Sequence, residues 1–316
     1  MELNDAMLDR LRQLEEKYSA MGQDMNSYLD GLLHADYLTY WDYIHLDTLL
    51  SLQNPRTPIP DERIFILYHQ ITELYFRLSL DAIEQLAQCQ PAPSAELFKR
   101  QIIRLNRYFT NLINSFDIMV DGMDRDEFLR FRMSLLPASG FQSVQYRMIE
   151  IASTDLRQLV HASKRELTAD VSDVGLLNAV LYWKSGATEL ASGKKTLTLR
   201  QFEAKYADEL VRFSQHYQSC NLRQLYLKLP SEAQSDPELC ELLREYDINA
   251  NVRWALSHYR SAVRYLDAKP KEIEATGGTN WQKYLPPRFQ RVVFFPELWT
   301  EDEMENWGKF MGKSAE

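Results

Sequence analysis

The chain lacks the features typical of secreted, membrane-spanning and nucleic-acid-binding proteins. Its three cysteines are scattered without metal-ligand spacing, which argues against a disulfide framework and predicts a reducing compartment, the cytoplasm. No apolar run approaches the roughly 20 residues that span a bilayer, and the acidic N-terminus has no signal-peptide pattern. The net charge of −9 disfavours nucleic acid or an anionic membrane as a partner.

Glycine and proline are also scarce. The 316 residues include only 11 Gly and 12 Pro, which argues against disorder and against a turn-rich all-β fold. Apolar residues recur at helical spacing over most of the chain, and the one short strand candidate is Arg291–Phe295. The sequence therefore predicts an all-α protein, a helical bundle. We expect residues 1–38 to form a helical arm and residues 39–316 a single domain.

Residues 5–33 read as an amphipathic helix or helix pair. This segment either packs on a neighbouring subunit or caps its own domain, and the sequence leaves both readings open.

A long helix is predicted to begin at Asp61, whose side chain can cap the N-terminus. Its longest apolar stripe has eight members: Ile64, Leu67, Tyr68, Ile71, Leu74, Tyr75, Leu78 and Leu86. Phe65, His69, Thr72 and Phe76 share an adjacent face. His69 therefore lies beside the expected core face, where it has either a packing role or a catalytic one.

A break near Pro137 separates two further helices. Arg132 precedes it, where an exposed guanidinium could reach into a cleft and hold a carboxylate by two hydrogen bonds. The alternative is a surface arginine paired with Asp126 or Glu127. After the break, the Ser139-Gly140 turn leads into a helix.

Trp254, His258, Ala262 and Tyr265 share one face of another predicted helix. A single imidazole among apolar groups is either a hydrogen-bonded core histidine or an axial ligand for a metal or haem iron. Further along, Thr276-Gly277-Gly278 would let a ligand approach the backbone closely, although most glycine pairs are turns.

Five stretches, kept in order between residues 40 and 299, resemble the tryptophan 2,3-dioxygenase family. They are Tyr40-x-x-Tyr43-x-x-Leu46-Asp47-x-Leu49-Leu50; Asp61-Glu62-x-x-Phe65-Ile66-x-x-His69-Gln70-x-x-Glu73-Leu74; Phe131-Arg132 with Ser139-Gly140-Phe141-Gln142-Ser143-x-Gln145-Tyr146-Arg147; Trp254-x-x-x-His258-x-Arg260; and Thr276-Gly277-Gly278 ahead of Phe294-Phe295-Pro296-Glu297-Leu298. Residues 151–250 match only in helical character. The resemblance implies a homotetrameric all-α enzyme with haem b. Such an enzyme uses O2 to cleave the indole C2–C3 bond of L-tryptophan, giving N-formylkynurenine in tryptophan catabolism, the kynurenine pathway.

The resemblance also implies roles for single residues. His258 matches the proximal ligand of the haem iron, and His69 the catalytic distal histidine that accepts a hydrogen bond from the indole N–H. Phe65 matches an aromatic wall, Arg132 the clamp on the substrate carboxylate, and Thr276 a hydroxyl at the substrate's amino-acid end. Further residues match substrate contacts (Phe128, Leu135, and Tyr40, Tyr43 and Ile44 reaching in from a neighbouring subunit) or cofactor contacts (Trp254, Ser139, Gly140 and Tyr146).

Several positions depart from the family pattern. Pro60 stands where a histidine is usual, Phe128 where tyrosine is frequent, and Leu136 where glycine precedes proline. The segment between His258 and Thr276 is also longer than usual. These departures leave two alternatives to the dioxygenase: a haem-dependent monooxygenase (hydroxylase) of another aromatic amino acid or indole derivative, and a helical ligand-binding scaffold without catalysis.

Overall fold

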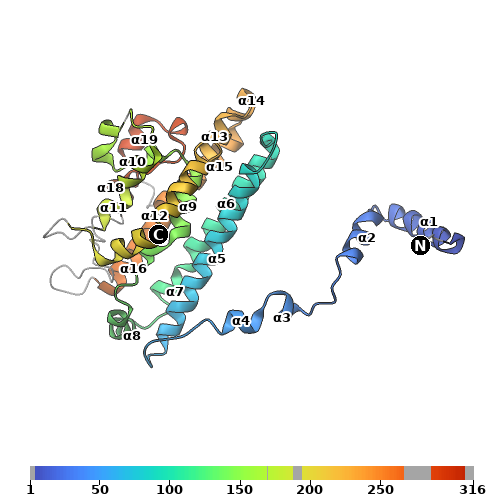
Figure 1. The fold of residues 1–316 in the computed structure, drawn as a ribbon, viewed down its shortest axis with the longest axis horizontal. Coiled ribbons are helices and arrows are strands. Elements are labelled where there is room, and N and C mark those ends of the chain that lie inside the picture. The colour runs from blue at the N-terminus through green and yellow to red at the C-terminus, as the bar shows by residue number, and fades with distance from the viewer. Residues whose placement is uncertain (1–3, 169, 188–193, 267–285, 310–316) are drawn as a thin grey trace. The chain divides into compact units, whose positions relative to one another are not determined.

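The computed structural model describes residues 4–168, 170–187, 194–266 and 286–309 (Figure 1). The chain divides into two compact units, Met1–Asn54 and Pro55–Glu316. The expected boundary after residue 38 stays a prediction. None of the described helices is long and apolar enough to cross a membrane.

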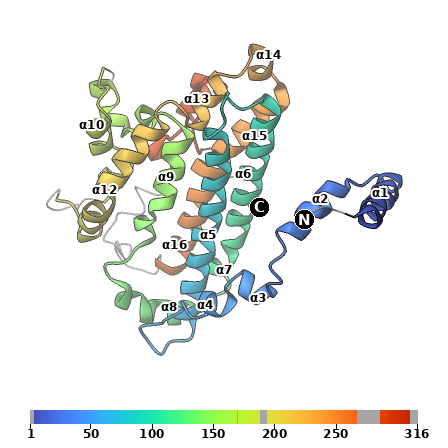
Figure 2. The ribbon, with the colours of Figure 1, turned by 45° about the vertical axis from the view of Figure 1, so that its right-hand side comes forward.

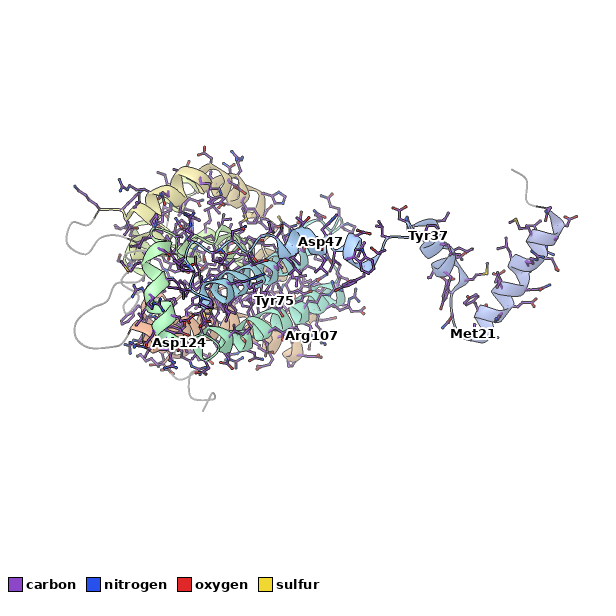
Figure 3. All side chains as sticks on the ribbon, turned by 90° about the horizontal axis from the view of Figure 1, so that it is seen from below. Met21, Tyr37, Asp47, Tyr75, Arg107 and Asp124 are labelled. Carbon is purple, nitrogen blue, oxygen red and sulfur yellow. The ribbon has the colours of Figure 1, made fainter. Side chains whose placement is uncertain are left out.

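The first unit is a series of short helices without a core. Its elements are α1 (Asp5–Ala20), α2 (Met25–Leu33), α3 (Tyr40–Tyr43) and α4 (Leu46–Leu50), so the expected helix pair within residues 5–33 is confirmed. The Asn4 and Asp24 side chains cap α1 and α2, and the Tyr18 and Tyr28 rings pack with centroids 4.5 Å apart. No described hydrophobic residue of this unit is buried, and Tyr37 (Figure 3) is 99% exposed.

The second unit holds all the long helices. In chain order the α-helices are α5 (Asp61–Ala87), α6 (Ala95–Ser115), α7 (Asp117–Val120), α8 (Arg125–Phe131), α9 (Val144–Ser153), α10 (Val174–Ala179), α11 (Tyr182–Gly186), α12 (Leu197–Tyr217), α13 (Leu222–Leu227), α14 (Ser231–Gln234), α15 (Pro237–Ile248), α16 (Trp254–Leu266), α18 (Pro287–Gln290) and α19 (Glu301–Glu305). The 3₁₀ turns are η1 (Arg132–Leu135), η2 (Gly140–Gln142), η3 (Leu156–Leu159), η4 (Ala162–Lys164), η5 (Glu166–Thr168) and η7 (Pro296–Leu298), and η6 (Asn249–Arg253) is a π turn.

Helices α5, α6 and α15 lie side by side and form the core (Figure 2). Ser94 caps α6 by accepting a hydrogen bond from the amide of Leu97. The apolar residues of α6 recur every three or four positions and are fully buried: Phe98, Ile102, Leu105, Phe109 and Leu112. Burial of each such side chain stabilises the fold by about 1.5–3 kcal/mol. With no strand in the described ranges beyond one isolated bridge between Val160 and Leu181, the all-α prediction is confirmed.

The face of α5 that is buried differs from the expected stripe. Thr72, Phe76 and Ile83 are buried, whereas Leu74 and Leu78 are 55% and 43% exposed. The prediction that the longest apolar stripe faces the core was wrong in its middle part, because the adjacent face packs on α6 and α9.

The start of α5 also differs from the expected capping. Pro60 occupies the cap position, and no side chain there accepts a hydrogen bond from the first turn. The Asp61 carboxylate instead accepts from the amide of Asp124, 2.6 Å away, and so joins α5 to the turn before α8. The prediction of Asp61 as the N-cap was therefore wrong.

Helices α15 and α16 form one continuous helix through the π turn η6. The buried Asp247 carboxylate, at the end of α15, accepts from the amides of Phe294 and Phe295 at 2.8 and 3.1 Å and from the Trp299 indole at 3.0 Å. The short strand candidate Arg291–Phe295 does not form a strand, and its Phe294 and Phe295 amides bond to the Asp247 side chain rather than to a neighbouring strand.

Candidate active site

His258 lies on α16 inside a group of aromatic rings. Its ring centroid is 4.4 Å from that of Trp254 and 4.6 Å from that of Phe116. Its Nδ1 lies 3.1 Å from the carbonyl oxygen of Trp254, one turn earlier. A carbonyl can only accept, so Nδ1 carries the hydrogen and Nε2 keeps its lone pair.

His69, on α5, has the same local arrangement. Its Nδ1 lies 2.7 Å from the carbonyl oxygen of Phe65, and the two rings pack with centroids 4.1 Å apart. Nε2 of His69 is therefore also a hydrogen-bond acceptor.

Aromatic contacts connect the two histidines. The Tyr68 ring meets the rings of His69 and Phe116 edge-on, at 5.9 and 5.6 Å, and Phe116 in turn contacts His258. A series of ring contacts thus links two histidines that are 189 positions apart in the sequence.

Burial keeps both imidazoles uncharged at neutral pH. It lowers the pKa of His69, and it lowers the pKa of His258 to about 4, with the charges of His69 and Arg147 acting in the same direction. Both side chains nevertheless keep some accessible surface. Neutral, partly accessible imidazoles can serve as ligands or hydrogen-bond acceptors.

Arg132, in the 3₁₀ turn after α8, is 7% exposed. The prediction of an exposed guanidinium was wrong, and the alternative of a surface arginine fails for the same reason. Burial lowers the pKa of Arg132, although a guanidinium remains charged at neutral pH. A cation at so low an exposure favours an anionic group nearby.

Phe128 and Phe65 belong to a second cluster of rings. The Phe128 centroid lies 6.2 Å from Phe65, 5.5 Å from Phe131 and 4.5 Å from Tyr265. The sequence suggested no role for Phe131 or for the Tyr265 ring, although Phe131 stands in a stretch that carries the resemblance and Tyr265 shares a helix face with His258. Their shared signal was an aromatic residue on the same helical face as a candidate residue.

The turn after Arg132 leads to α9. Leu135 is half-buried at the end of η1, and the Ser139 hydroxyl accepts from the amide of Phe141 in a capping box that opens η2 at the exposed Gly140. Tyr146, on α9, donates from its hydroxyl to the carbonyl oxygen of Ala250, 3.0 Å away. The structure thus places Tyr146 against the helix that bears His258.

Thr276 lies outside the described residues. Tyr40, Tyr43 and Ile44 belong to the first unit, and Tyr40 and Tyr43 are 71% and 73% exposed.

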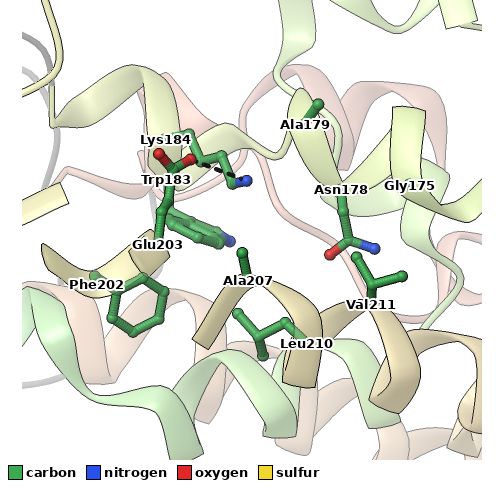
Figure 4. A pocket seen from close by; sticks show the side chains of 10 residues that line it. All are labelled: Gly175, Asn178, Ala179, Trp183, Lys184, Phe202, Glu203, Ala207, Leu210 and Val211. Atoms are coloured by element: carbon green, nitrogen blue, oxygen red, sulfur yellow. Dashed lines mark ion pairs between the residues drawn. The ribbon is translucent and has the colours of Figure 1, made fainter. Parts of the chain in front are cut away.

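The structure also contains features that the sequence reasoning did not anticipate. A cavity of about 150 Å³ lies between α10, α11 and α12, lined by Trp183, Phe202 and the ion pair Lys184–Glu203 among others (Figure 4). No three His, Cys, Asp or Glu side chains gather as a metal site in the described part of the chain.

The fold and the site together define a class of protein. It is an all-α protein in which two neutral histidines, connected through aromatic rings, keep acceptor nitrogens. The buried Arg132 directly follows Phe131, whose ring packs on that of Phe65. Such a combination suits a flat aromatic group with an anionic end.

Comparison with known proteins identifies the family. A family profile described as tryptophan 2,3-dioxygenase matches residues 31–174. The chain is 31% identical over 281 residues to the tryptophan 2,3-dioxygenase of Ruegeria sp. (strain TM1040), covering 84% of this chain and 92% of the relative. Identity is 30% to the enzymes of Bradyrhizobium diazoefficiens (83% of this chain, 91% of the relative) and Bacillus thuringiensis subsp. konkukian (85% and 94%). The chain belongs to the tryptophan 2,3-dioxygenase family.

Proposed function

We propose that the protein is a haem-dependent oxidoreductase that cleaves the indole C2–C3 bond of L-tryptophan with O2, giving N-formylkynurenine. Relatives named tryptophan 2,3-dioxygenase that align along most of the chain support this activity. The observation that carries the proposal is the pair of neutral histidines, His69 and His258, each with its Nε2 lone pair available.

The donor chemistry at His258 fits haem b. An axial imidazole ligand must be neutral and must offer one ring nitrogen, while the other nitrogen donates to a backbone oxygen. His258 meets both conditions, with a pKa of about 4 and its Nδ1 directed to the Trp254 carbonyl. His258 would hold the iron, and the rings of Trp254 and Phe116 would keep the imidazole in place. Bound haem supplies the activation of dioxygen.

His69 and Phe65 would bind the indole. The Phe65 ring is a flat apolar surface beside the imidazole, and Nε2 of His69 can accept the indole N–H. The lowered pKa of His69 supports this role, because a protonated imidazole has no acceptor nitrogen.

Arg132 would hold the substrate carboxylate through a two-point, charge-assisted contact. Its low exposure supports this role, because a partly desolvated cation binds an anion more strongly than a solvated one. We assign Thr276 to the amino-acid end of the substrate from the family resemblance alone. Leu135, Ser139, Gly140 and Tyr146 stay candidates for contacts with substrate or haem. Phe128 offers no hydroxyl to the substrate carboxylate. Arg132 would therefore contribute more to carboxylate recognition than it does in family members with tyrosine at this position.

We also propose that the chain assembles as a homotetramer. No hydrophobic residue in the described part of the first unit is buried, and the α5 stripe of Ile71, Leu74 and Leu78 is exposed. Exposed apolar surfaces of this kind are typical of interfaces between subunits. Tyr40, Tyr43 and Ile44 would then contact the active site of a neighbouring subunit.

We propose the cytoplasm as the compartment, because three cysteines without a disulfide are consistent with a reducing environment.

An absorption spectrum and a product mass test the proposal. The reduced, haem-loaded protein is mixed with L-tryptophan and air, and oxygen uptake and products are followed. We expect a haem band and a product heavier than tryptophan by two oxygen atoms. A gain of one oxygen atom would establish the monooxygenase instead. A protein that retains no haem would leave only a helical scaffold.

A further inference from the structure

The π turn η6 lies directly before the helix that bears His258. It spans Asn249–Arg253, and the amide of Trp254 donates to the carbonyl of Asn249, five residues back. A π turn holds one more residue than an α-turn and is frequent at functional sites. A π turn persists only where contacts from neighbouring elements stabilise it, because its packing and hydrogen bonds are poorer than those of an α-helix.

The extra residue changes the direction in which His258 points. Tyr246 and His258 are twelve positions apart, so in an uninterrupted α-helix they would lie about 120° apart around the axis. One inserted residue reduces this angle by about 100°, so the two side chains lie about 20° apart around the axis. The contacts agree, because Tyr246 packs on Phe109 of α6 and His258 packs on Phe116, the residue that ends this helix two turns later. The π turn therefore keeps the imidazole on the buried side.

Hydrogen bonds of side chains, both within the π turn and from neighbouring helices, stabilise the turn. Asn249 donates to the Asn106 side chain of α6 at 3.1 Å, and Arg253 donates to Asn249 at 2.8 Å. Asn251 donates to Asp247, which is itself bonded to the segment 294–299. From α9, the Tyr146 hydroxyl donates to the carbonyl of Ala250 at 3.0 Å. A side chain that bonds to a carbonyl within a helix is a recognised cause of local widening.

Tyr146 is itself firmly held. Its ring packs on Phe76 at 5.5 Å, and the Arg147 guanidinium lies 5.2 Å from the ring centroid. Arg147 is fixed in turn by a buried ion pair with Glu150 at 2.8 Å. The Phe76 ring also contacts Trp254, at 5.7 Å. The hydroxyl of Tyr146 is therefore fixed against the turn that sets the rotation of α16.

We propose that Tyr146 is a positioning residue for the His258 imidazole, acting through the carbonyl of Ala250 in the π turn. The inference rests on the proposed function, in which His258 ligates the haem iron. Tyr146 acts here through the backbone of the helix, without touching the reacting atoms. Without its hydroxyl, α16 gains rotational freedom, and the direction of Nε2 becomes less well defined.

The test compares Tyr146→Phe with a matched control in the haem-loaded protein. Phenylalanine keeps the ring and removes only the hydroxyl. The control is Tyr226→Phe, because the Tyr226 hydroxyl also donates to a backbone carbonyl, that of Gln234, at 2.8 Å. Two quantities are measured: the iron–histidine stretching band of the ferrous protein by resonance Raman, and the rate of haem transfer to a scavenger protein. Far-ultraviolet circular dichroism confirms that both variants fold.

We expect Tyr146→Phe to shift or broaden the iron–histidine band and to speed haem loss about five- to tenfold, the effect of one buried hydrogen bond. Tyr226→Phe should match the unchanged protein. An unaltered band in Tyr146→Phe, or equal changes in both variants, would overturn the inference. Absence of any iron–histidine band from the unchanged protein would instead overturn the ligand role of His258, and this inference with it.

Discussion

His258 makes two separate contacts with Trp254, a ring contact and a hydrogen bond. The imidazole packs edge-on against the indole, at 85° and 4.4 Å between centroids, and its Nδ1 donates to the carbonyl oxygen of the same residue. One residue therefore fixes both the tilt of the imidazole and its tautomer, which leaves Nε2 as the nitrogen available to a ligand.

Replacement of His258 by alanine should abolish haem retention. The variant lacks the proposed axial nitrogen, so we expect the haem absorption band to fall by more than tenfold after gel filtration. The exposed His216 provides the control, since His216→Ala should keep the band. Equal haem content in both variants would contradict the assignment.

The pH profile should report the lowered pKa of His69. An ordinary histidine titrates near 6.5, whereas burial keeps His69 neutral to lower pH. We therefore expect kcat/KM for tryptophan to stay level as the pH falls from 8 to 6, because Nε2 still accepts the indole N–H. Initial rates of product absorbance across this range check the prediction, and a fall centred on 6.5 would count against it.

Arg132→Lys should weaken tryptophan binding with little effect on the fold. Lysine keeps the charge but loses the two-point geometry, so KM should rise about ten- to a hundredfold. The control is Arg130→Lys, at an exposed position of α8, the helix that precedes Arg132. If the two variants have the same KM, Arg132 does not hold the carboxylate.

Asp247 should give the protein a measurable acid dependence of stability. Burial raises the pKa of Asp247 to about 6 from an ordinary 3.8, despite its hydrogen bonds. The folded state thus holds the proton more tightly, so this group's contribution is fully present below pH 3.8 and is lost as the pH rises through 6. The difference amounts to roughly 3 kcal/mol.

Urea unfolding at pH 4, 5, 6 and 7 measures this contribution. Asp247→Asn should remove it, so the variant's free energy of unfolding should change less between pH 4 and 6. The variant should also be less stable overall, because an amide nitrogen cannot accept from the Phe294 and Phe295 amides or the Trp299 indole. Parallel pH profiles for the two proteins would refute the prediction.

Charge on the exposed α5 stripe should break up the assembly. Leu74 is 55% exposed, so Leu74→Lys should change the stability of one chain by less than about 0.5 kcal/mol. At an interface the same lysine would be desolvated, and the apparent mass by light scattering should fall. Leu167→Lys, at another exposed leucine in η5, should leave the mass unchanged. A Leu74→Lys tetramer would show that α5 lies outside the interface.

The sequence predicted the helices well because apolar spacing follows the α-helical repeat. It failed for the buried face of α5, since an apolar stripe looks the same whether the chain's own core or another subunit covers it. It also missed the π turn, because spacing arguments assume 3.6 residues per turn throughout. The spacing of Trp254 and His258 placed them correctly on one face, but their direction relative to Tyr246 depends on contacts from α6 and α9.

Part of the candidate site followed from sequence and part did not. Phe65 and His69 share a helix face, so local periodicity was sufficient to pair them. The burial of Arg132 depends on how the turn before Pro137 folds back, which no local pattern reveals. Asp247 gave no signal either, because its partners lie about 50 positions later in the chain.

The bonds of Asp247 also bear on the order of biosynthesis. A ribosome releases the chain from its N-terminus, so α15 and α16 emerge before residues 294–299. Until those residues arrive, the carboxylate beside the π turn lacks the Phe294 amide and the Trp299 indole. A nascent chain that has made His258 therefore has only part of the hydrogen bonding around the π turn in place. We therefore expect stable capture of haem at His258 only after residues 294–299 have left the ribosome.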